Sequence, residues 1–195
     1  MWNLGGHITP EGSRFSKEDL LAVAVFVASF VLSLRIMSGN GLLPGNDPGV
    51  HLNHIFEIVK TGRVSLQQFS LTLPLLHVFV AIWLDLAGAV DLLQAVFFLK
   101  ILMSFIGAIS VLAVYLFCRE TFGKVPALLS SIVLAISVPL MEITSWGGYP
   151  NMAALLYITL IFFLLVNNRF KLPARFLLIG IMALSLFLLQ LPRAF

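Results

Sequence analysis

The chain has 195 residues, of which 59% are apolar and only 11% are charged, and its mean hydropathy is +1.01. Soluble domains carry about a quarter charged residues, and a chain of this length has too little interior to bury so much apolar surface. The composition therefore excludes a soluble globular protein. The formal net charge of +3 is a signal of membrane topology rather than of nucleic-acid binding.

Uncharged stretches predict how often the chain crosses a membrane, because about twenty apolar residues span the hydrocarbon layer. We predict an all-α, polytopic transmembrane helical bundle with five spans, at about 19–37, 93–118, 125–142, 151–167 and 176–192.

Local signals mark the ends of these spans. Ser16 and Asp19 form a capping-box pattern at the start of the first span. Gly123 is a C-cap after the second span, and Pro139 stops the third near its far end. The second span also carries a face of small residues that a neighbouring helix can approach closely, namely Gly107, Ala108, Ser110 and Ala113.

The segment 71–90 is apolar and long enough to cross, yet it contains Pro74, His77 and Asp85. If it does not cross, the distribution of Lys and Arg favours a cytoplasmic N-terminus. If it does cross, the same rule favours an external N-terminus, so charge alone leaves both topologies open. An isolated Asp85 facing lipid is costly, which favours a helix half-inserted on the outer face.

The least lipid-like part after the N-terminal tail lies in the external loop 38–92, and function is sought there. Within it, 45–66 has the apolar periodicity of an amphipathic helix. Asp47 occupies the N-cap position before Pro48, and Gly62 ends the helix. His51 and His54 fall with Glu57 on a polar side opposite the apolar one.

These residues also have ordinary structural explanations. An aspartate before a proline at a helix start is a common cap that needs no chemistry. His51, His54 and Glu57 fit the wet face of a helix lying on a membrane. A three-residue His pair with no third ligand nearby is weak evidence for zinc.

The order of elements at the start of the chain resembles that of the polytopic GT-C glycosyltransferases, which take sugars from polyprenyl-phosphate or polyprenyl-diphosphate carriers. An apolar helix with Arg35 near its outer end is followed by a short loop, then by Asp47 and Pro48, then by an amphipathic helix. The catalytic subunit of oligosaccharyltransferase has an Asp-Pro or Asp-Ala motif in this first external loop.

Three further segments resemble the same family, and together the matches cover most of the chain in the family's order. LTLPLLHVFVAIWLDLAG at 71–88 is similar to a Tyr-Pro-Pro-Leu-Phe-His type segment and keeps its proline and histidine. GAISVLAVYLFCRETFGK at 107–124 resembles a helix that ends in an Arg-x-x-Phe-Gly turn. TSWGGYPNMAALL at 144–156 looks like the second external loop of archaeal and bacterial members.

The resemblance implies a membrane glycosyltransferase that moves a sugar from a polyprenyl-phosphate carrier to an acceptor on the external face. It also implies that 71–90 stays external, so that the protein is a multi-pass plasma-membrane protein with a cytoplasmic N-terminus. Asp47 then matches the catalytic aspartate, which either accepts the proton of the acceptor hydroxyl or helps to hold a metal. Candidate partners of the donor phosphate are Lys60, Arg63, His51 and His54.

One difference from the family pattern concerns the use of a metal ion. Oligosaccharyltransferase carries a second acidic pair in the next external loop, whereas the matching stretch here, 148–152, contains no acid. Glu142 lies nearby with a different spacing. The resemblance therefore favours a metal-independent enzyme that uses a lipid monophosphate sugar, with Asp47 as the ligand if a metal is bound. On this interpretation Trp146, Tyr149 and Asn151 line the sugar or phosphate pocket; the alternative is an interfacial aromatic belt with a Gly-Pro turn.

Members of this superfamily have more than five helices, so we expect an N-terminal portion of a longer enzyme with weak or no activity by itself. Its expected partners are membrane lipid, the lipid-linked sugar and the C-terminal helices of the parent chain, and not nucleic acid. Two other functions stay open. One is a transporter or permease fragment, for which isolated charges near the membrane midplane and an internal repeat are typical. The other is a non-catalytic membrane assembly subunit.

Overall fold

The computed structural model describes residues 16–39, 48–64, 74–88, 91–146, 148–167 and 170–190. Within these ranges the chain forms eight helices and no strand. The prediction of an all-α protein is therefore confirmed. Asp47, the predicted catalytic residue, lies outside the described residues.

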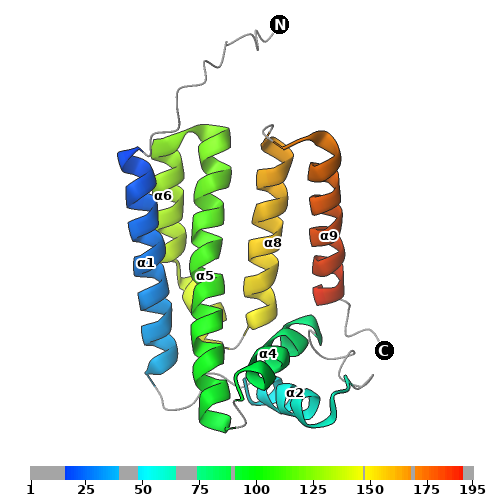
Figure 1. Ribbon diagram of the computed structural model, residues 1–195. Coiled ribbons are helices and arrows are strands. Elements are labelled where there is room, and N and C mark those ends of the chain that lie inside the picture. Colours follow the sequence, from blue (N-terminus) through cyan, green and yellow to red (C-terminus); the bar gives the residue numbers. More distant parts are fainter. Residues whose placement is uncertain are drawn as a thin grey trace, which may run out of the picture.

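Six of the helices build an elongated bundle (Figure 1). They are α1 (Lys17–Ser38), α5 (Leu92–Phe122), α6 (Lys124–Ala135), α7 (Val138–Trp146), α8 (Tyr149–Val166) and α9 (Leu172–Gln190). The long helix α5 is central, and it contacts α1, α6 and α8. Gly107 faces α8, because a Cβ atom at this position would lie 2.9 Å from Cε of Met152 and would displace the end of that side chain. The predicted small-residue face therefore does receive a neighbouring helix.

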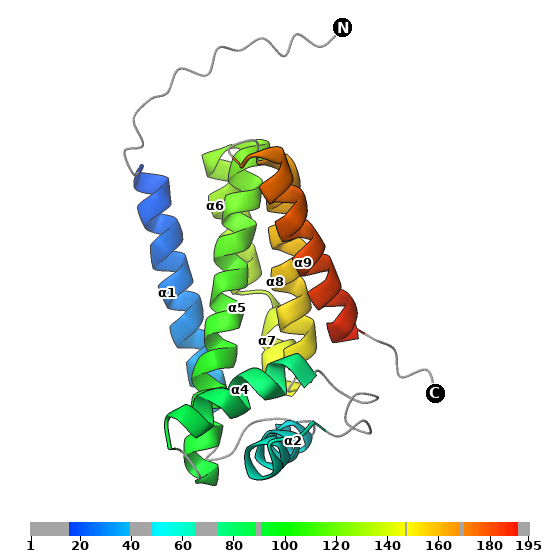
Figure 2. The ribbon, with the colours of Figure 1, turned by 45° about the vertical axis from the view of Figure 1, so that its right-hand side comes forward.

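The other two helices, α2 (Pro48–Thr61) and α4 (Pro74–Leu86), pack against each other at one end of the bundle. Figures 1 and 2 show α4 lying across this end instead of running alongside the long helices. The same end holds the start of α8 and the far end of α1. The segment whose crossing was undecided from its sequence thus forms a helix that caps the bundle.

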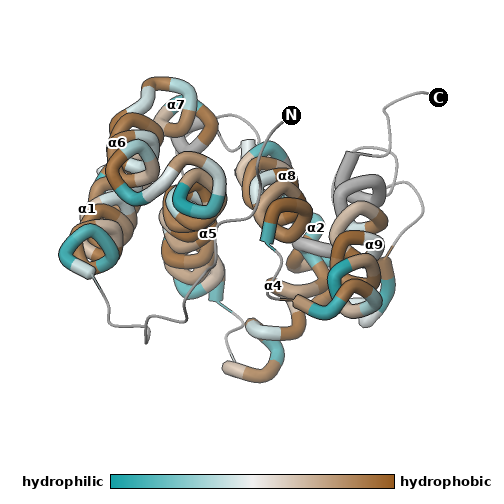
Figure 3. Tube along the Cα trace, turned by 90° about the horizontal axis from the view of Figure 1, so that it is seen from above, coloured by the Kyte–Doolittle hydropathy of each residue, from teal (hydrophilic) through white to brown (hydrophobic). Residues whose placement is uncertain are grey.

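Two helices, α1 and α5, are long and apolar enough to span a membrane. The other apolar helices are shorter, so five spans stay a prediction. The outer surface also fits a lipid environment, since Leu20, Val133 and Leu177 each expose more than 60% of their surface. In Figure 3 the helices are hydrophobic along most of their length, with hydrophilic residues at their near ends.

The predicted third span, 125–142, is not one continuous helix. Helix α6 ends at Ala135, and α7 begins at Val138. Pro139 has no amide hydrogen and its ring clashes with the carbonyl four residues earlier, so it cannot continue α6. Ser137 begins the new helix: its Oγ lies 3.4 Å from the Leu140 amide, which donates to it. Pro139 therefore opens a helix where the sequence analysis expected it to stop one.

The expected helix ends are otherwise present. The hydroxyl of Ser16 accepts a hydrogen bond from the Asp19 amide, and the Asp19 carboxylate accepts one from the Ser16 amide, which completes the capping box. Gly123 follows α5 with φ of 93°, and Gly62 follows α2 with φ of 63°. Both glycines adopt a positive φ that other residues rarely take, so they are suited to end these helices.

A buried carboxylate links α1 to α5 at the bundle end away from α2 and α4. Asp19 is only 6% exposed. Its Oδ1 accepts a hydrogen bond from the Tyr115 hydroxyl at 2.8 Å and lies 2.7 Å from Nη1 of Arg119. Because a buried carboxylate is stable only when its oxygens are paired, these contacts fix how α1 and α5 pack.

Replacing Tyr115 with phenylalanine tests this link. Tyr115→Phe removes a hydrogen bond to a charged acceptor and is expected to lower the free energy of unfolding by about 2 kcal/mol. Denaturant unfolding in lipid micelles measures the effect. Tyr157→Phe is the matched control, because the Tyr157 hydroxyl has no hydrogen bond in the part of the chain that the structure describes. Equal stability of the two variants would contradict the assignment.

Candidate functional site

Helix α2 presents one buried face to α4 and the bundle. His51, Leu52, Ile55 and Ile58 are buried, at spacings that place them on one side of a helix. They belong to, or lie beside, an apolar cluster that also holds Met37 of α1. His51 is only 2% exposed, so its assignment to a wet polar face was wrong. A helical pattern places a residue on a face but does not reveal which neighbouring helix covers that face.

Helix α4 is apolar on two sides. One side, made of His77, Val80, Ala81 and Leu84, is buried against α2 and the bundle. The other side exposes large apolar residues, namely Phe79, Ile82, Trp83 and Leu86. A helix that is covered on one face and exposes apolar side chains on the other is suited to lie half-inserted at a membrane surface.

Three histidines and one tyrosine meet where α2, α4 and α8 come together, and we call His51, His54, His77 and Tyr149 the histidine–tyrosine cluster. Nδ1 of His51 lies 2.8 Å from Nε2 of His77, a hydrogen bond between two buried imidazoles. The His54 ring centre is 5.4 Å from that of His77, and the Tyr149 ring centre is 5.2 Å from that of His51.

The His77 imidazole is held in its uncharged form. Burial, together with the neighbouring His51 and His54, lowers the pKa of His77 to about 3. An uncharged imidazole has one donor and one acceptor nitrogen, so two of them can share a single hydrogen bond without a buried charge. His77 therefore contributes a neutral polar group to the cluster at physiological pH.

Two polar atoms of the cluster lack a partner within the described residues. They are Nε2 of His54 and the hydroxyl oxygen of Tyr149, and both are buried. Leaving a buried donor or acceptor unsatisfied costs about 1 to 3 kcal/mol, so such groups call for an explanation. A bound ligand that hydrogen-bonds to both atoms would remove this cost. These two atoms make the cluster the candidate binding site of the protein.

The structure brings only some of the predicted site residues together. His51, His54 and Tyr149 share the cluster, whereas Lys60 and Arg63 are exposed at the far end of α2. Glu142 is exposed on α7 and Asn151 is exposed in the first turn of α8. Trp146 is the last residue of α7, and its side chain lies outside the described parts.

His77 is the member of the cluster that the sequence analysis did not select. The signal for it was present, because 71–88 keeps the proline and histidine of the family segment that it resembles. A histidine in an otherwise apolar stretch that must not face lipid also predicts a buried polar partner. What the sequence does not reveal is that His51, 26 residues away, supplies this partner.

The residues that the structure describes give no direct support for a metal site. Among the described residues, no group of three or more His, Cys, Asp or Glu side chains is arranged to hold a metal ion.

Comparison with known proteins finds no relative of this chain. No protein-family model, no curated protein and no solved structure matches this chain. The resemblance to the GT-C enzymes therefore depends on the sequence motifs alone, and it stays a prediction.

The buried His77 predicts a pH dependence of the α2–α4 contact. Its pKa is about 3 in the folded protein and 6.5 when unperturbed, so the unfolded form binds the proton more tightly. The contact is fully stable above pH 6.5 and loses stability as the pH falls toward 3. Between pH 7 and pH 5 the loss amounts to about 2 kcal/mol.

Hydrogen exchange of the α2 amides, corrected for the intrinsic effect of pH on exchange, measures this loss. His77→Gln removes the titrating group and is expected to flatten the dependence. His7→Gln, which changes a histidine in the N-terminal tail, should leave it intact. Protection of α2 that does not change between pH 7 and pH 5 in the unmodified protein would show that His77 is not buried as a neutral imidazole.

Proposed function

We propose that the protein is a membrane glycosyltransferase that transfers a sugar from a polyprenyl-phosphate carrier to an acceptor on the external face of the plasma membrane. The observation that carries this proposal is the pair of buried, unpartnered polar atoms in the histidine–tyrosine cluster. His54 belongs to α2, the helix that begins directly after Asp47, and the Tyr149 ring lies against His51 of the same helix. A ligand with hydroxyl or phosphate oxygens suits the two atoms.

The chain connectivity ties the proposed catalytic group to the cluster. Asp47 is bonded to Pro48, the first residue of α2, and His51 follows in the first turn of that helix. The cluster is therefore reached within four residues of the carboxylate.

The proposed reaction gives the carboxylate a defined task. The acceptor hydroxyl oxygen attacks the anomeric carbon of the donor, and the bond from that carbon to the phosphate oxygen breaks. The phosphate leaves with the bonding electron pair, and Asp47 accepts the hydroxyl proton. The Tyr149 hydroxyl and Nε2 of His54 then orient the sugar through hydrogen bonds, and Arg63 and Lys60 supply positive charge for the phosphate.

A metal is not required in this scheme. The stretch 148–152 contains no acid, and Glu142 is exposed on α7. We therefore favour a lipid monophosphate donor, whose single phosphate leaves less charge to neutralise than a diphosphate. Trp146 and Asn151 flank the start of α8 and are proposed to bound the donor pocket on that side.

Replacing Asp47 with asparagine tests the proposal. Asparagine caps a helix nearly as well as aspartate does but cannot accept the proton. In membranes that contain the full-length parent chain, Asp47→Asn is expected to lower sugar transfer by at least about a hundredfold, the usual contribution of a general base. Transfer of a radiolabelled sugar from polyprenyl phosphate is the measurement.

Asp85→Asn is the matched control, because it removes an exposed carboxylate from the same external loop. It should leave both transfer and protein level unchanged. Full transfer by Asp47→Asn would show that Asp47 acts only as a helix cap and would refute its catalytic role. A solute transported equally well by both variants would instead favour a transporter.

A further inference from the structure

Helix α5 buries a positive charge that has no role in the proposed reaction. Lys100 is only 7% exposed. Among the residues that the structure describes, the other buried charged side chain is Asp19, which pairs with Arg119 at the opposite end of the bundle. A buried ammonium group is costly unless an anion or several hydrogen-bond acceptors surround it. The burial of Lys100 therefore points to an anionic group at the same place.

Two contacts fix the level at which Lys100 lies relative to α1. The Ser104 hydroxyl donates to Sδ of Met37 at 3.5 Å, and a Cβ atom at Gly107 would lie 3.8 Å from Oγ of Ser33. The two helices therefore run in opposite directions, as Figure 1 also shows. Lys100 comes one turn before Ser104 on the same side of α5. It therefore lies about 6 Å farther along the bundle, just past the end of α1.

The contacts of α8 lead to the same level from the side of the histidine–tyrosine cluster. Met152 of α8 lies against Gly107, and Tyr149 comes one turn earlier in α8. The Tyr149 ring in turn lies against His51 in the first turn of α2. Helices α5 and α8 both begin at this end of the bundle (Figure 1). Lys100, two turns before Gly107 on the same side of α5, therefore lies farther toward α2 than Tyr149 does.

The chain leaves α1 and enters α2 at this end of the bundle. Helix α1 ends at Ser38, and α2 begins at Pro48. The sequence that joins them, 39–47, reads GNGLLPGND, and Asp47 is its only charged residue. Asp47 is therefore the carboxylate that this connection offers to Lys100.

Among the described residues, no other side chain at this end of the bundle offers a buried negative charge. The carboxylates there are exposed, namely Glu57, Asp85, Asp91 and Glu142. The remaining ionisable groups of α2, α4 and α8 that are buried or half-buried are not anions at neutral pH, namely His51, His54, His77 and Tyr149. The connection between α1 and α2 is therefore the source of negative charge that fits Lys100.

We propose that Lys100 forms an ion pair with Asp47 and holds this catalytic carboxylate in place in its charged form. The inference rests on the proposed function and adds a positioning residue to it. A carboxylate at the membrane edge loses water, which favours its neutral form, and a positive charge within about 4 to 6 Å opposes this effect. During transfer Asp47 takes the proton of the acceptor hydroxyl, and Lys100 neither gains nor loses one.

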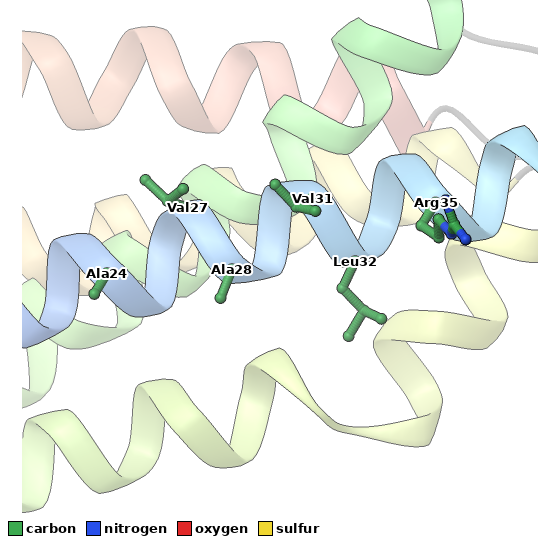
Figure 4. A pocket seen from close by; sticks show the side chains of 6 residues that line it. All are labelled: Ala24, Val27, Ala28, Val31, Leu32 and Arg35. Carbon is green, nitrogen blue, oxygen red and sulfur yellow. The ribbon is translucent and has the colours of Figure 1, made fainter.

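Arg35, the cation nearest to the end of α1, does not suit this role. It is exposed, and Figure 4 shows it on the side of α1 that also carries Ala24 and Ala28. Met37, which contacts α5, comes two residues later and thus lies on nearly the opposite side of α1. Water also screens an exposed charge, whereas a buried charge acts on its neighbours through a medium of lower dielectric constant.

A double-mutant cycle tests the ion pair without any transfer assay. Denaturant unfolding in lipid micelles compares the unmodified protein with Lys100→Met, Asp47→Asn and the double variant. Removing one partner of a buried ion pair destabilises a protein more than removing both. Lys100→Met is therefore expected to lower the denaturant midpoint, and to lower it less than about half as much when Asp47→Asn is already present. Equal losses in the two backgrounds would overturn the proposal.

The pH dependence of sugar transfer distinguishes a positioning role from a merely structural one. In membranes that contain the full-length parent chain, transfer should rise with pH as Asp47 loses its proton. Lys100→Met removes the positive charge and is expected to move the midpoint of this rise upward by at least about one pH unit. Lys100→Arg keeps the charge and should keep the midpoint. Lys124→Met is the matched control, because it removes an exposed lysine at the opposite end of the bundle, and it should leave the midpoint unchanged.

The remaining outcomes separate this inference from the proposed function. An unchanged midpoint in Lys100→Met, with a higher KM for the donor, would overturn the proposal and make Lys100 a donor contact. Normal transfer by Asp47→Asn would refute the proposed function, and a coupled cycle would then leave the ion pair as a structural contact. Loss of transfer in Asp47→Asn, with equal losses in the cycle, would refute the ion pair alone. If Lys100→Met does not fold, recovery of helix content in the double variant would support the pair, and its failure to recover would overturn it.

Discussion

The hydrogen bond between His51 and His77 is the interaction on which the α2–α4 end of this protein depends. It joins α2 to α4 inside an otherwise apolar cluster that includes Met37 of α1 and Tyr149 of α8. Without this bond the His77 imidazole would be a buried polar group in an apolar surrounding, which is costly. Each ring therefore fixes the other, and the pair sets how α2 and α4 dock on the bundle. Asp47 directly precedes α2 in the chain. The docking of α2 therefore also bears on where the proposed catalytic residue can reach.

The candidate site lies at the bundle end where α2, α4 and the start of α8 come together. The histidine–tyrosine cluster offers buried hydrogen-bonding groups, among them the neutral imidazole of His77, and these suit sugar hydroxyls or a phosphate oxygen. Met37 at the end of α1 packs within the apolar cluster of the site. The end of α1 therefore helps to hold α2 and α4 on the bundle.

The sequence predicts the local features of this fold well, because they depend on single residues. The capping box at Ser16, the turn at Gly123 and the bounds of α2 between Pro48 and Gly62 follow from backbone conformation that only a few residue types support. The long-range contacts could not be predicted in this way. Periodicity placed His51 on the polar side of α2, yet α4 covers it, and only the folded chain shows that His77 is its partner. The break at Pro139 was visible in the sequence, but whether a proline ends one helix or opens the next depends on the packing beyond it.

The central claim of this account is that α2 and the histidine–tyrosine cluster face the exterior of the cell. Labelling of single cysteines with a membrane-impermeant maleimide in intact cells tests it most directly, in a Cys118→Ser background that removes the native thiol. Lys60→Cys at the exposed end of α2 is predicted to react from outside. Lys124→Cys, at the opposite end of the bundle, is predicted to react only after the membrane is permeabilised. Labelling of Lys124→Cys in intact cells, with Lys60→Cys protected, would contradict the account, because the site would then face the cytoplasm.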